Sequence, residues 1–379
     1  MNEIKEIGEN HKQPDKAKEY NRKKIIFSLI ELGILLSLLL ILVFSGLSLK
    51  IKDFALSFND NPYIQFFIYI LIIGVFELII FTPLNFYTEF LLEHKYSLSN
   101  QTFIAWLWEF LKSLGVSLVL FLPLIFLLYY FLRNLGDFWW VAVGIMIFIF
   151  TVVLSEIAPL IIFPLFYKFK PIEDLEIKAK LTEMCEKVGL KIVGVFSFNI
   201  SKNTKKANAG FTGLGKSKRI ILGDNLLNNF TVDEVRSVFA HELGHYYHSH
   251  IWKSILSGAV STFISLFIAS ILYKNSLNFF GFKGIDDIAA IPLLFLFLFL
   301  YGLITMPLSN AISRRFERTA DRYALETMEG EKEFVSSMLK LKDINLADWE
   351  PNPIVEFFFY SHPSIKKRIK MAEGIFPDK

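Results

Sequence analysis

Cysteine is almost absent from the sequence, which contains one, Cys185, among 379 residues. A single thiol excludes an intramolecular disulfide and a cysteine-rich zinc site, so a metal ion would have to be bound by histidine and carboxylate side chains. Charge of one sign is also lacking, because the formal net charge is only +3. Proteins that bind nucleic acid through their overall charge are strongly basic, so this balance predicts no nucleic-acid partner.

Apolar residues, in contrast, are in excess. They make up 53% of the sequence and include 40 phenylalanines, which is too many for an ordinary soluble protein. A helix needs roughly 20 mostly apolar residues to cross a bilayer, since every main-chain polar group must be satisfied internally. The stretches that meet this requirement are 25–49, 64–81, 114–132, 138–162, 255–272 and 288–306.

The segment before the first stretch is polar and ends in three basic residues. It lacks the short apolar core of a cleaved signal peptide, and its basic end favours a cytoplasmic N-terminus. Six crossings return the C-terminus to the cytoplasmic face, where the two long polar segments can form one domain. We therefore predict a mainly α multi-pass membrane protein, with about six transmembrane helices and a small α+β domain on one face.

The predicted domain organisation alternates membrane and polar regions. Its parts are a polar N-terminal segment at 1–24, a four-helix transmembrane region at 25–167, the first part of the polar domain at 168–253, two transmembrane helices at 254–313, and the C-terminal part of the domain at 314–379.

The polar region between the fourth and fifth stretches has its own local pattern. Helical periodicity comes first, and β-branched or aromatic runs follow it. The helical pattern covers residues 172–188, and the runs that predict a small sheet are 191–200, 206–212 and 218–222. A new helix should begin at Thr231, which forms a capping box with Glu234, and should run through His250 and beyond.

The residues with a catalytic pattern lie on that new helix, where His241, Glu242 and His245 spell H-E-x-x-H. Histidines four residues apart share one helix face and can bind one zinc ion, while the glutamate between them reaches a water molecule at the metal. Zinc lowers the pKa of such a water toward ~7, and the carboxylate accepts its proton as it attacks a peptide carbonyl. The motif therefore predicts a zinc peptidase with one zinc ion per chain.

A catalytic zinc site needs a third protein ligand and an open fourth position. His248 and His250 follow the motif closely, but their spacing places them at the surface or an interface. A second pattern, N-x-x-S-R-x-x-E-x-x-A-D, begins at Asn310 and contains Glu317 and Asp321. One of these acids can bind zinc while the other orients a ligating imidazole, since they lie one turn apart. An exposed helix with ordinary charge pairs has the same spacing, so the spacing leaves both interpretations open.

These motifs, with Ser361, His362, Pro363 and Arg368 near the end of the sequence, resemble the M48 peptidases. Within that family the chain is similar to the Ste24 type, the CAAX prenyl proteases of membranes, and the similarity covers most of its length. The alternative within the family is a quality-control protease of the HtpX kind. Its members have fewer membrane stretches before the zinc motif, so the four found here favour the Ste24 type.

The resemblance implies a role for each residue that matches a family motif. Zinc would be bound by His241, His245 and Glu317, with Glu242 as the general base. The supporting roles are those of Asp321 and Asn310 behind the zinc ligands, His362 and Arg368 at the oxyanion, and Asn208 and Ala209 in an edge strand to which an extended substrate adds as a further strand.

The sequence also departs from the family pattern. Tyr246 stands where a tryptophan often follows the motif, six membrane stretches replace the seven of eukaryotic members, and no endoplasmic-reticulum retention signal is evident. These differences bear on the closed helical chamber of the family and on a prenylated substrate, not on the zinc site.

Residues 210–217 satisfy the phosphate-binding pattern G-x-x-x-x-G-K-S. A strand pattern follows them, whereas a phosphate-binding loop must lead into a helix whose N-terminus faces the phosphate. We interpret the pattern as a hairpin turn and predict no nucleotide partner.

Together these observations predict an integral-membrane zinc metalloendopeptidase that acts on a peptide or protein substrate. The family resemblance implies cleavage near the C-terminus of a lipidated substrate, with membrane lipid around the helices. Two other classes stay open on the sequence alone. One is an inactive scaffold that retains its metal, and the other is a transporter that uses Glu31, Glu77 and Glu156 inside the predicted membrane stretches.

Overall fold

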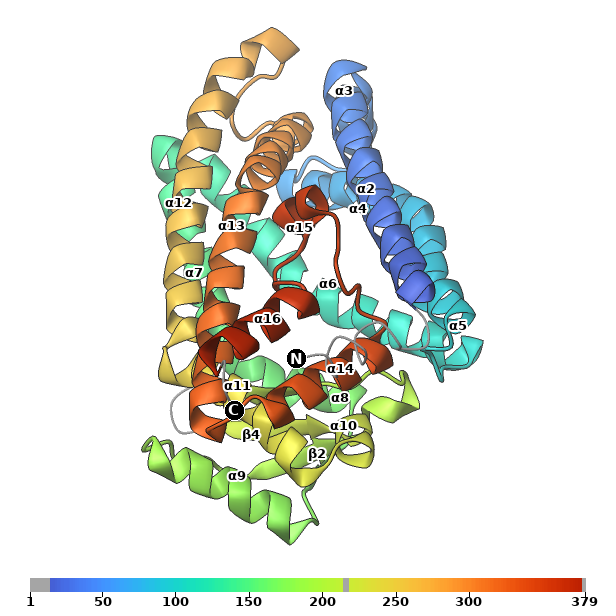
Figure 1. The fold of residues 1–379 in the computed structure, drawn as a ribbon. Helices are drawn as coiled ribbons and strands as arrows, with labels where there is room; N and C mark the ends of the chain where they lie inside the picture. Colours follow the sequence, from blue (N-terminus) through green and yellow to red (C-terminus); the bar gives the residue numbers. More distant parts are fainter. Residues whose placement is uncertain (1–13, 214–217, 377–379) are drawn as a thin grey trace.

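The computed structural model describes residues 14–213 and 218–376, and helices dominate it (Figure 1). Within these residues six helices are long and apolar enough to cross a bilayer, as the sequence predicts. They contain the elements α2 (Pro14–Phe44), α4 (Pro62–Asn85), α6 (Phe103–Asn134), α7 (Trp139–Ile157), α12 (His250–Ser276) and α13 (Ile291–Met328).

The first membrane helix begins and ends earlier than the apolar stretch 25–49 predicts. Gly46 adopts a left-handed conformation with φ of 72°, so α2 stops at Phe44 and a separate helix, α3 (Leu47–Leu56), follows. The Ser48 hydroxyl donates a hydrogen bond to the carbonyl of Ala289, which ties α3 to the 3-10 turn before α13. Apolar residues continue across the break, and hydropathy therefore does not detect it.

Two membrane helices pass through a wider π-helical turn. The helix α4 continues through η1 (Phe86–Leu91) into α5 (Leu92–Lys95), and α7 continues through η3 (Ala158–Ile162) into α8 (Phe163–Phe166). Pro83 lies shortly before η1 and Pro159 lies within η3, so each π turn accompanies a residue that has no main-chain donor. The 3-10 turns are η2 (Gly136–Phe138), η4 (Ile200–Lys202), η5 (Asn278–Phe280) and η6 (Ile288–Ala290).

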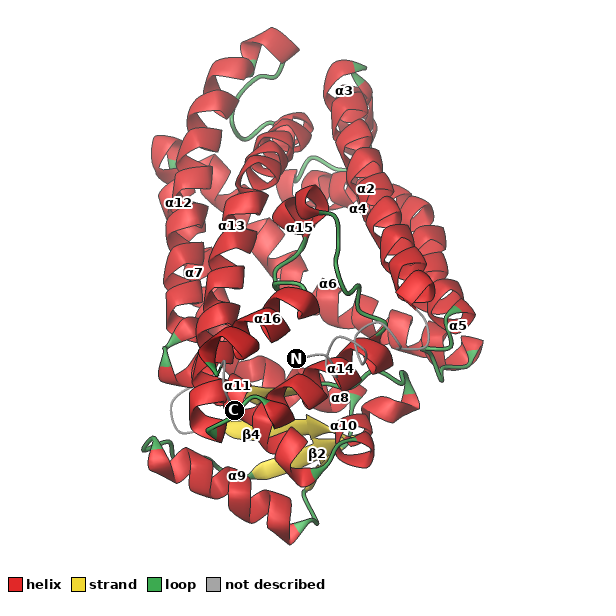
Figure 2. Ribbon diagram, in the orientation of Figure 1, coloured by secondary structure: helices red, strands yellow, loops and turns green. Residues whose placement is uncertain are grey.

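The small sheet lies at one end of the molecule, shown in yellow in Figure 2. Its strand order is β1-β2-β4-β3, in which β2 and β4 are parallel and each outer strand is antiparallel to its neighbour. The strands are β1 (Phe169–Pro171), β2 (Val195–Phe198), β3 (Ala209–Thr212) and β4 (Arg219–Gly223). Three of them fall in the predicted runs, and β1 was missed because three residues ending in proline show no alternation.

The antiparallel pairing of β3 with β4 agrees with the hairpin interpretation of the phosphate-binding pattern. Residues 214–217 of that pattern lie outside the described part of the chain, as do residues 1–13 of the predicted polar segment.

Six further helices complete the small domain. They are α9 (Leu175–Lys187), α10 (Asp224–Asn229), α11 (Val232–Tyr247), α14 (Lys332–Asn345), α15 (Pro353–Phe359) and α16 (Ile365–Ile375). The core of the domain is built around α11, whose Val235, Phe239 and Leu243 are all buried. The membrane helix α13 continues into this core without a break and packs along α11.

Residues near the ends of two membrane helices form hydrogen bonds with the small domain. The Asn100 main chain, in the loop after α5, donates to the carbonyl of Asn203 at 3.0 Å. The side chain of Asn21, near the start of α2, donates to the carbonyl of Leu346 at 2.7 Å. The structure therefore confirms a mainly α membrane protein with a small α+β domain on one face.

One predicted helix was wrong in its extent. The sequence predicts a single helix from Thr231 through His250, but α11 ends at Tyr247 and α12 begins at His250. Ser249, between them, has a left-handed φ of 55°, a conformation that the sequence pattern gives no reason to expect. The chain therefore turns between the two helices and brings residues at the start of α12 back toward α11.

Candidate metal centre

The helix α11 is anchored at its start by the predicted capping box. The Thr231 hydroxyl accepts from the main chain of Glu234, and the Glu234 carboxylate accepts from the main chain of Thr231 at 2.8 Å. Glu234 also accepts from Lys340 and Ser336 of α14, each at 2.6 Å. Burial raises the pKa of Glu234, but these hydrogen bonds outweigh burial and hold the pKa below its usual range.

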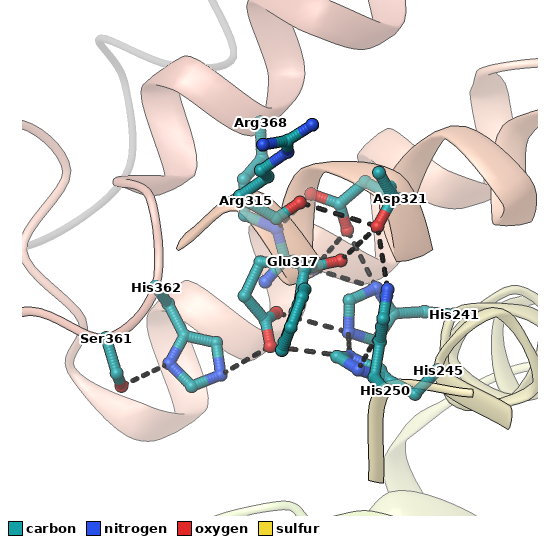
Figure 3. Close-up of polar contacts among 11 residues, drawn as sticks. His241, His245, His250, Arg315, Glu317, Asp321, Ser361, His362 and Arg368 are labelled. Carbon is teal, nitrogen blue, oxygen red and sulfur yellow. Dashed lines mark hydrogen bonds and ion pairs between the residues drawn. The ribbon is translucent and has the colours of Figure 1, made fainter. Parts of the chain in front are cut away.

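Three donor atoms converge where α11 faces α13, as Figure 3 shows. The Nε2 atoms of His241 and His245 are 3.1 Å apart, and each lies 3.3 Å from an oxygen of Glu317. Ligand atoms about 2.0–2.2 Å from a tetrahedral ion are separated by about 3.3–3.6 Å. The observed spacing is therefore close to what a zinc ion requires, even though the two histidines come from one helix and Glu317 from another.

The carboxylate of Glu317 gives a second indication that the cluster suits a cation. Its Oε2 atom is buried, lies 3.3 Å from Nε2 of His241, and accepts no hydrogen bond from any other group within the described residues. One long contact satisfies a buried carboxylate oxygen poorly, so a cation bound between this oxygen and the histidines would stabilise it, which makes it a suitable ligand atom.

Asp321 holds the far side of His241. Its Oδ1 lies 2.8 Å from His241 Nδ1, while Arg368 donates to both oxygens of Asp321. Asp321 is fully buried, and this contact leaves the Nε2 atom of His241 directed at the cluster. Burial lowers the pKa of His241, but the hydrogen bonds with Asp321 and Glu317 outweigh it and raise the pKa to about 9.

Glu242 follows His241 on the same helix, and its carboxyl lies within the electrostatic influence of both motif histidines. Burial raises the pKa of Glu242 above its usual range, and the positive character of His241 and His245 opposes that rise. A carboxylate whose pKa is raised toward neutrality is better suited to exchange protons with a substrate.

His362 approaches the cluster from the loop between α15 and α16. Its Nε2 atom lies 3.3 Å from an oxygen of Glu317, and its Nδ1 atom lies 2.9 Å from the Ser361 hydroxyl. Figure 3 shows Glu317 between His362 on one side and the two motif histidines on the other. The side chain of His362 is 60% exposed, so this side of the cluster is open to a substrate.

Arg368 and Asn310 both contact parts of the chain that surround the cluster, and the oxyanion role that the resemblance implies for Arg368 stays a prediction. Arg368 is buried beside Asp321, and its Nη2 atom is 3.3 Å from Nδ1 of His241, on the side of the ring away from the cluster. Asn310 donates to the carbonyl of Phe358, and Arg314, one turn later, donates to the carbonyl of Tyr360 at 2.6 Å. Both α13 residues thus hold the end of α15 and the loop that carries His362.

The strand β3, which follows Asn208, is an edge of the sheet, with β4 as its partner. The main chain of Gly223 in β4 donates to the carbonyl of Asn208 at 2.9 Å. Because antiparallel pairing alternates, the main-chain groups of Ala209 and Phe211 point away from β4, toward the free edge. The Phe211 ring packs on α11, and a cavity of about 250 Å³ is lined by both Phe211 and His245.

Sequence reasoning did not connect His250 with the site, because it placed His250 at the surface or an interface. His250 is only 4% exposed, and its Nδ1 atom lies 3.1 Å from Nδ1 of His245. Residues five apart do not share a helix face, and only the left-handed turn at Ser249 brings the two rings together.

A two-histidine helix motif, a carboxylate from a second helix and six membrane helices together define an integral-membrane metallopeptidase. Comparison with known proteins agrees. The family described as "Peptidase family M48" matches residues 171–375, and the family described as "CAAX prenyl protease N-terminal, five membrane helices" matches residues 5–168. The chain belongs to peptidase family M48, and its N-terminal half places it with the Ste24 type rather than the HtpX type.

Individual relatives are similar over most of the chain. "CAAX prenyl protease 1" of Saccharomyces cerevisiae is 31% identical over 78% of this chain and 69% of its own length. "Uncharacterized metalloprotease YhfN" of Bacillus subtilis is 28% identical over 94% of this chain and 84% of its own length. The crystal structure of S. mikatae Ste24p superposes with a TM-score of 0.83 at 25% identity, covering 98% of this chain and 94% of the other.

Proposed function

We propose that this metallopeptidase binds one zinc ion through His241, His245 and Glu317, and that Glu242 is its general base. The observation that carries the proposal is the convergence of the three donor atoms, all within 4.8 Å of one another, at the junction of α11 and α13. The buried Oε2 atom of Glu317, whose polar contact is one long approach of His241 Nε2 at 3.3 Å, supports a cation at that point.

In this proposal, each side chain around the cluster has a separate role in peptide hydrolysis. A zinc ion held there would supply a Lewis acid that activates water and polarises the scissile carbonyl. Glu242 would accept the proton that the attacking water loses and would then donate it to the leaving amine. His362, on the open side of Glu317, would donate a hydrogen bond to the carbonyl oxygen as it gains negative charge.

Arg368 and Asp321 would not contact the metal but would orient one of its ligands. Arg368 binds Asp321, which binds Nδ1 of His241, so the chain of contacts fixes the orientation of a zinc ligand. These contacts support a positioning role for Arg368 more directly than contact with the oxyanion.

We further propose that the substrate is a peptide with a lipidated C-terminus, cleaved near that end. The support is the similarity to proteins named CAAX prenyl protease, together with a zinc site that lies where two membrane helices meet the small domain. A lipid chain that stays in or near the bilayer would bring such a C-terminus close to this site. If the site cleaved only unfolded protein chains, the protein would instead be a quality-control protease.

The substrate proposal is tested by incubating the purified protein with a farnesylated C-terminal peptide, the same peptide without the lipid, and casein. We expect cleavage of the farnesylated peptide and little cleavage of the other two, with product identified by mass spectrometry. The Glu242→Gln protein serves as the control for contaminating proteases. Cleavage of casein at a rate equal to that of the farnesylated peptide would contradict the proposal.

Extended substrate would add as a strand along β3, beside Asn208 and Ala209. Because the Ala209 N–H faces the free edge, Ala209→Pro removes one donor available to substrate without removing a β3–β4 hydrogen bond. One main-chain hydrogen bond is worth about 1 kcal/mol, so KM should rise by at least about fivefold. Peptide kinetics measure the effect.

The matched control for the edge strand is Ala209→Ser, which retains the N–H and should keep a wild-type KM. Zinc content and melting temperature should be the same in both variants, because neither touches the metal cluster. A correctly folded Ala209→Pro protein with unaltered kinetics would show that substrate does not pair with this edge.

We also propose that the active site faces the cytoplasm, on the evidence of the basic end of the first 24 residues. The test uses a Cys185→Ser background, although burial already raises the pKa of the Cys185 thiol to about 12 and makes it unreactive. Lys187→Cys, on exposed α9, should then react only from the cytoplasmic side, and Asp60→Cys, in the loop before α4, only from the other side. Labelling in the reverse sense would overturn the orientation.

A further inference from the structure

His250 lies in a closed set of contacts behind the zinc ligand His245. Its Nδ1 atom is 3.1 Å from Nδ1 of His245 (Figure 3). Its Nε2 atom is 3.0 Å from the Thr319 hydroxyl. Its ring stacks on Phe316 with centroids 4.4 Å apart and planes inclined by 12°. Phe316 and Thr319 flank Glu317 on α13, so the helix that supplies the carboxylate also holds this imidazole.

The direction of each hydrogen bond follows from the Thr319 hydroxyl, which has one proton to donate. Its oxygen lies 2.8 Å from the carbonyl of Phe316, which can only accept. The hydroxyl proton is used there, so the Thr319 oxygen accepts from Nε2–H of His250. A neutral imidazole with its proton on Nε2 has a free electron pair on Nδ1, and the Nδ1 atom of His250 therefore accepts from Nδ1–H of His245.

This assignment has a direct consequence for the metal. When His245 carries its proton on Nδ1, its Nε2 atom keeps the electron pair that a metal requires, and that atom faces His241 and Glu317. Asp321 has the same effect on His241, because its Oδ1 atom lies 2.8 Å from Nδ1 of His241 and leaves Nε2 free for a metal. Each zinc histidine thus has a buried partner that fixes which nitrogen is free, a carboxylate for one and an imidazole for the other.

We infer that His250 is a positioning residue, which accepts a hydrogen bond from Nδ1 of His245 and thereby holds that ring in the tautomer and orientation that bind zinc. The inference rests on the proposed zinc site. His250 itself does not bind the metal, since its Nδ1 faces His245 and its Nε2 faces Thr319. The role accounts for a buried histidine, for the turn at Ser249 and for the placement of Thr319 two residues after Glu317 on α13.

The test measures zinc affinity, by competition with a chromogenic chelator, for the full chain in detergent and in the inactive Glu242→Gln background. We expect His250→Leu, which keeps the bulk of the ring but removes the acceptor, to weaken zinc binding by roughly 10- to 100-fold. His250→Asn places an amide oxygen near the original Nδ1 and should recover most of that affinity. Thr319→Val, which leaves both rings in place, should cause a smaller loss.

Controls separate this role from packing and from failure of the zinc site itself. His248→Leu, on the neighbouring ring that makes no hydrogen bond to a zinc ligand within the described residues, should keep wild-type affinity. Wild-type affinity in His250→Leu, or equal losses in the Leu and Asn variants, would overturn the inference. His245→Ala tests the site independently. If the His245→Ala variant retains zinc, the proposed site is wrong. If His245→Ala loses zinc but His250→Leu binds zinc as the wild type does, only the role of His250 is refuted.

Discussion

Replacement of Glu242 by glutamine is expected to lower kcat by roughly 10²- to 10⁴-fold, because the amide cannot accept the proton that the attacking water must lose. Glutamine has nearly the same shape as glutamate, so the variant should fold as the wild type does. Glu242 is not one of the three converging donors, so one zinc ion per chain should remain bound. Single-turnover cleavage of the best peptide substrate, with zinc measured by elemental analysis, distinguishes loss of the base from loss of the metal.

The uncharged variant should also change the pH dependence of cleavage. Burial raises the pKa of Glu242, and the group must be ionised to act as a base. Activity of the wild type should therefore fall as the pH drops through that pKa, and the residual activity of Glu242→Gln should lack this acid limb. Near-wild-type turnover by Glu242→Gln would refute the assignment of the base.

Removal of Glu317 is expected to abolish zinc binding at micromolar metal concentration. Glu317→Ala deletes the proposed ligand from α13 and leaves two histidines of one helix, which cannot complete a site with three protein ligands. The loss should exceed the roughly 10- to 100-fold that follows from removing a hydrogen-bond partner behind a ligand, as in Asp321→Asn. His241→Ala and His245→Ala should behave like Glu317→Ala.

The order of these effects is the informative result. Zinc affinity should decrease from wild type to Asp321→Asn and decrease much further in Glu317→Ala, because the first change disturbs a ligand and the second deletes one. Full zinc content and full activity in Glu317→Ala would show that the third ligand has been misassigned.

Sequence reasoning reached the helical half of the site because its signals are local. The capping box at Thr231 and the four-residue spacing of His241 and His245 each depend on one helix, and the structure shows both. The acidic pattern around Glu317 was recognisable in the same way, but its spacing alone did not distinguish a ligand from a surface charge pair. Only packing of α13 on α11 brings Glu317 to the two histidines.

The features that sequence reasoning missed depend on single residues or on tertiary contacts. The turns at Gly46 and Ser249 each come from one left-handed residue within a continuing helical pattern, and hydropathy averages over both. His250 was assigned to the surface or an interface because helical geometry alone directs it away from His245. The contact of Arg368 with Asp321 joins residues 47 apart in the sequence and so depends on tertiary packing, while the oxyanion role of Arg368 implied by the family resemblance stays a prediction.

The motif H-E-x-x-H names three positions and leaves two unspecified, Leu243 and Gly244, yet in this chain neither is free to vary. Leu243 is fully buried in the core of the small domain. A Cβ atom at Gly244 would lie 2.9 Å from Cα of Ala320, on the turn of α13 that follows Glu317. A larger residue at Gly244 would push the two helices apart and withdraw the carboxylate from the histidines, although every metal ligand would still be present. A search of sequences for the ligands alone would score such a chain as intact, so the glycine is as informative about metal binding as the histidines are.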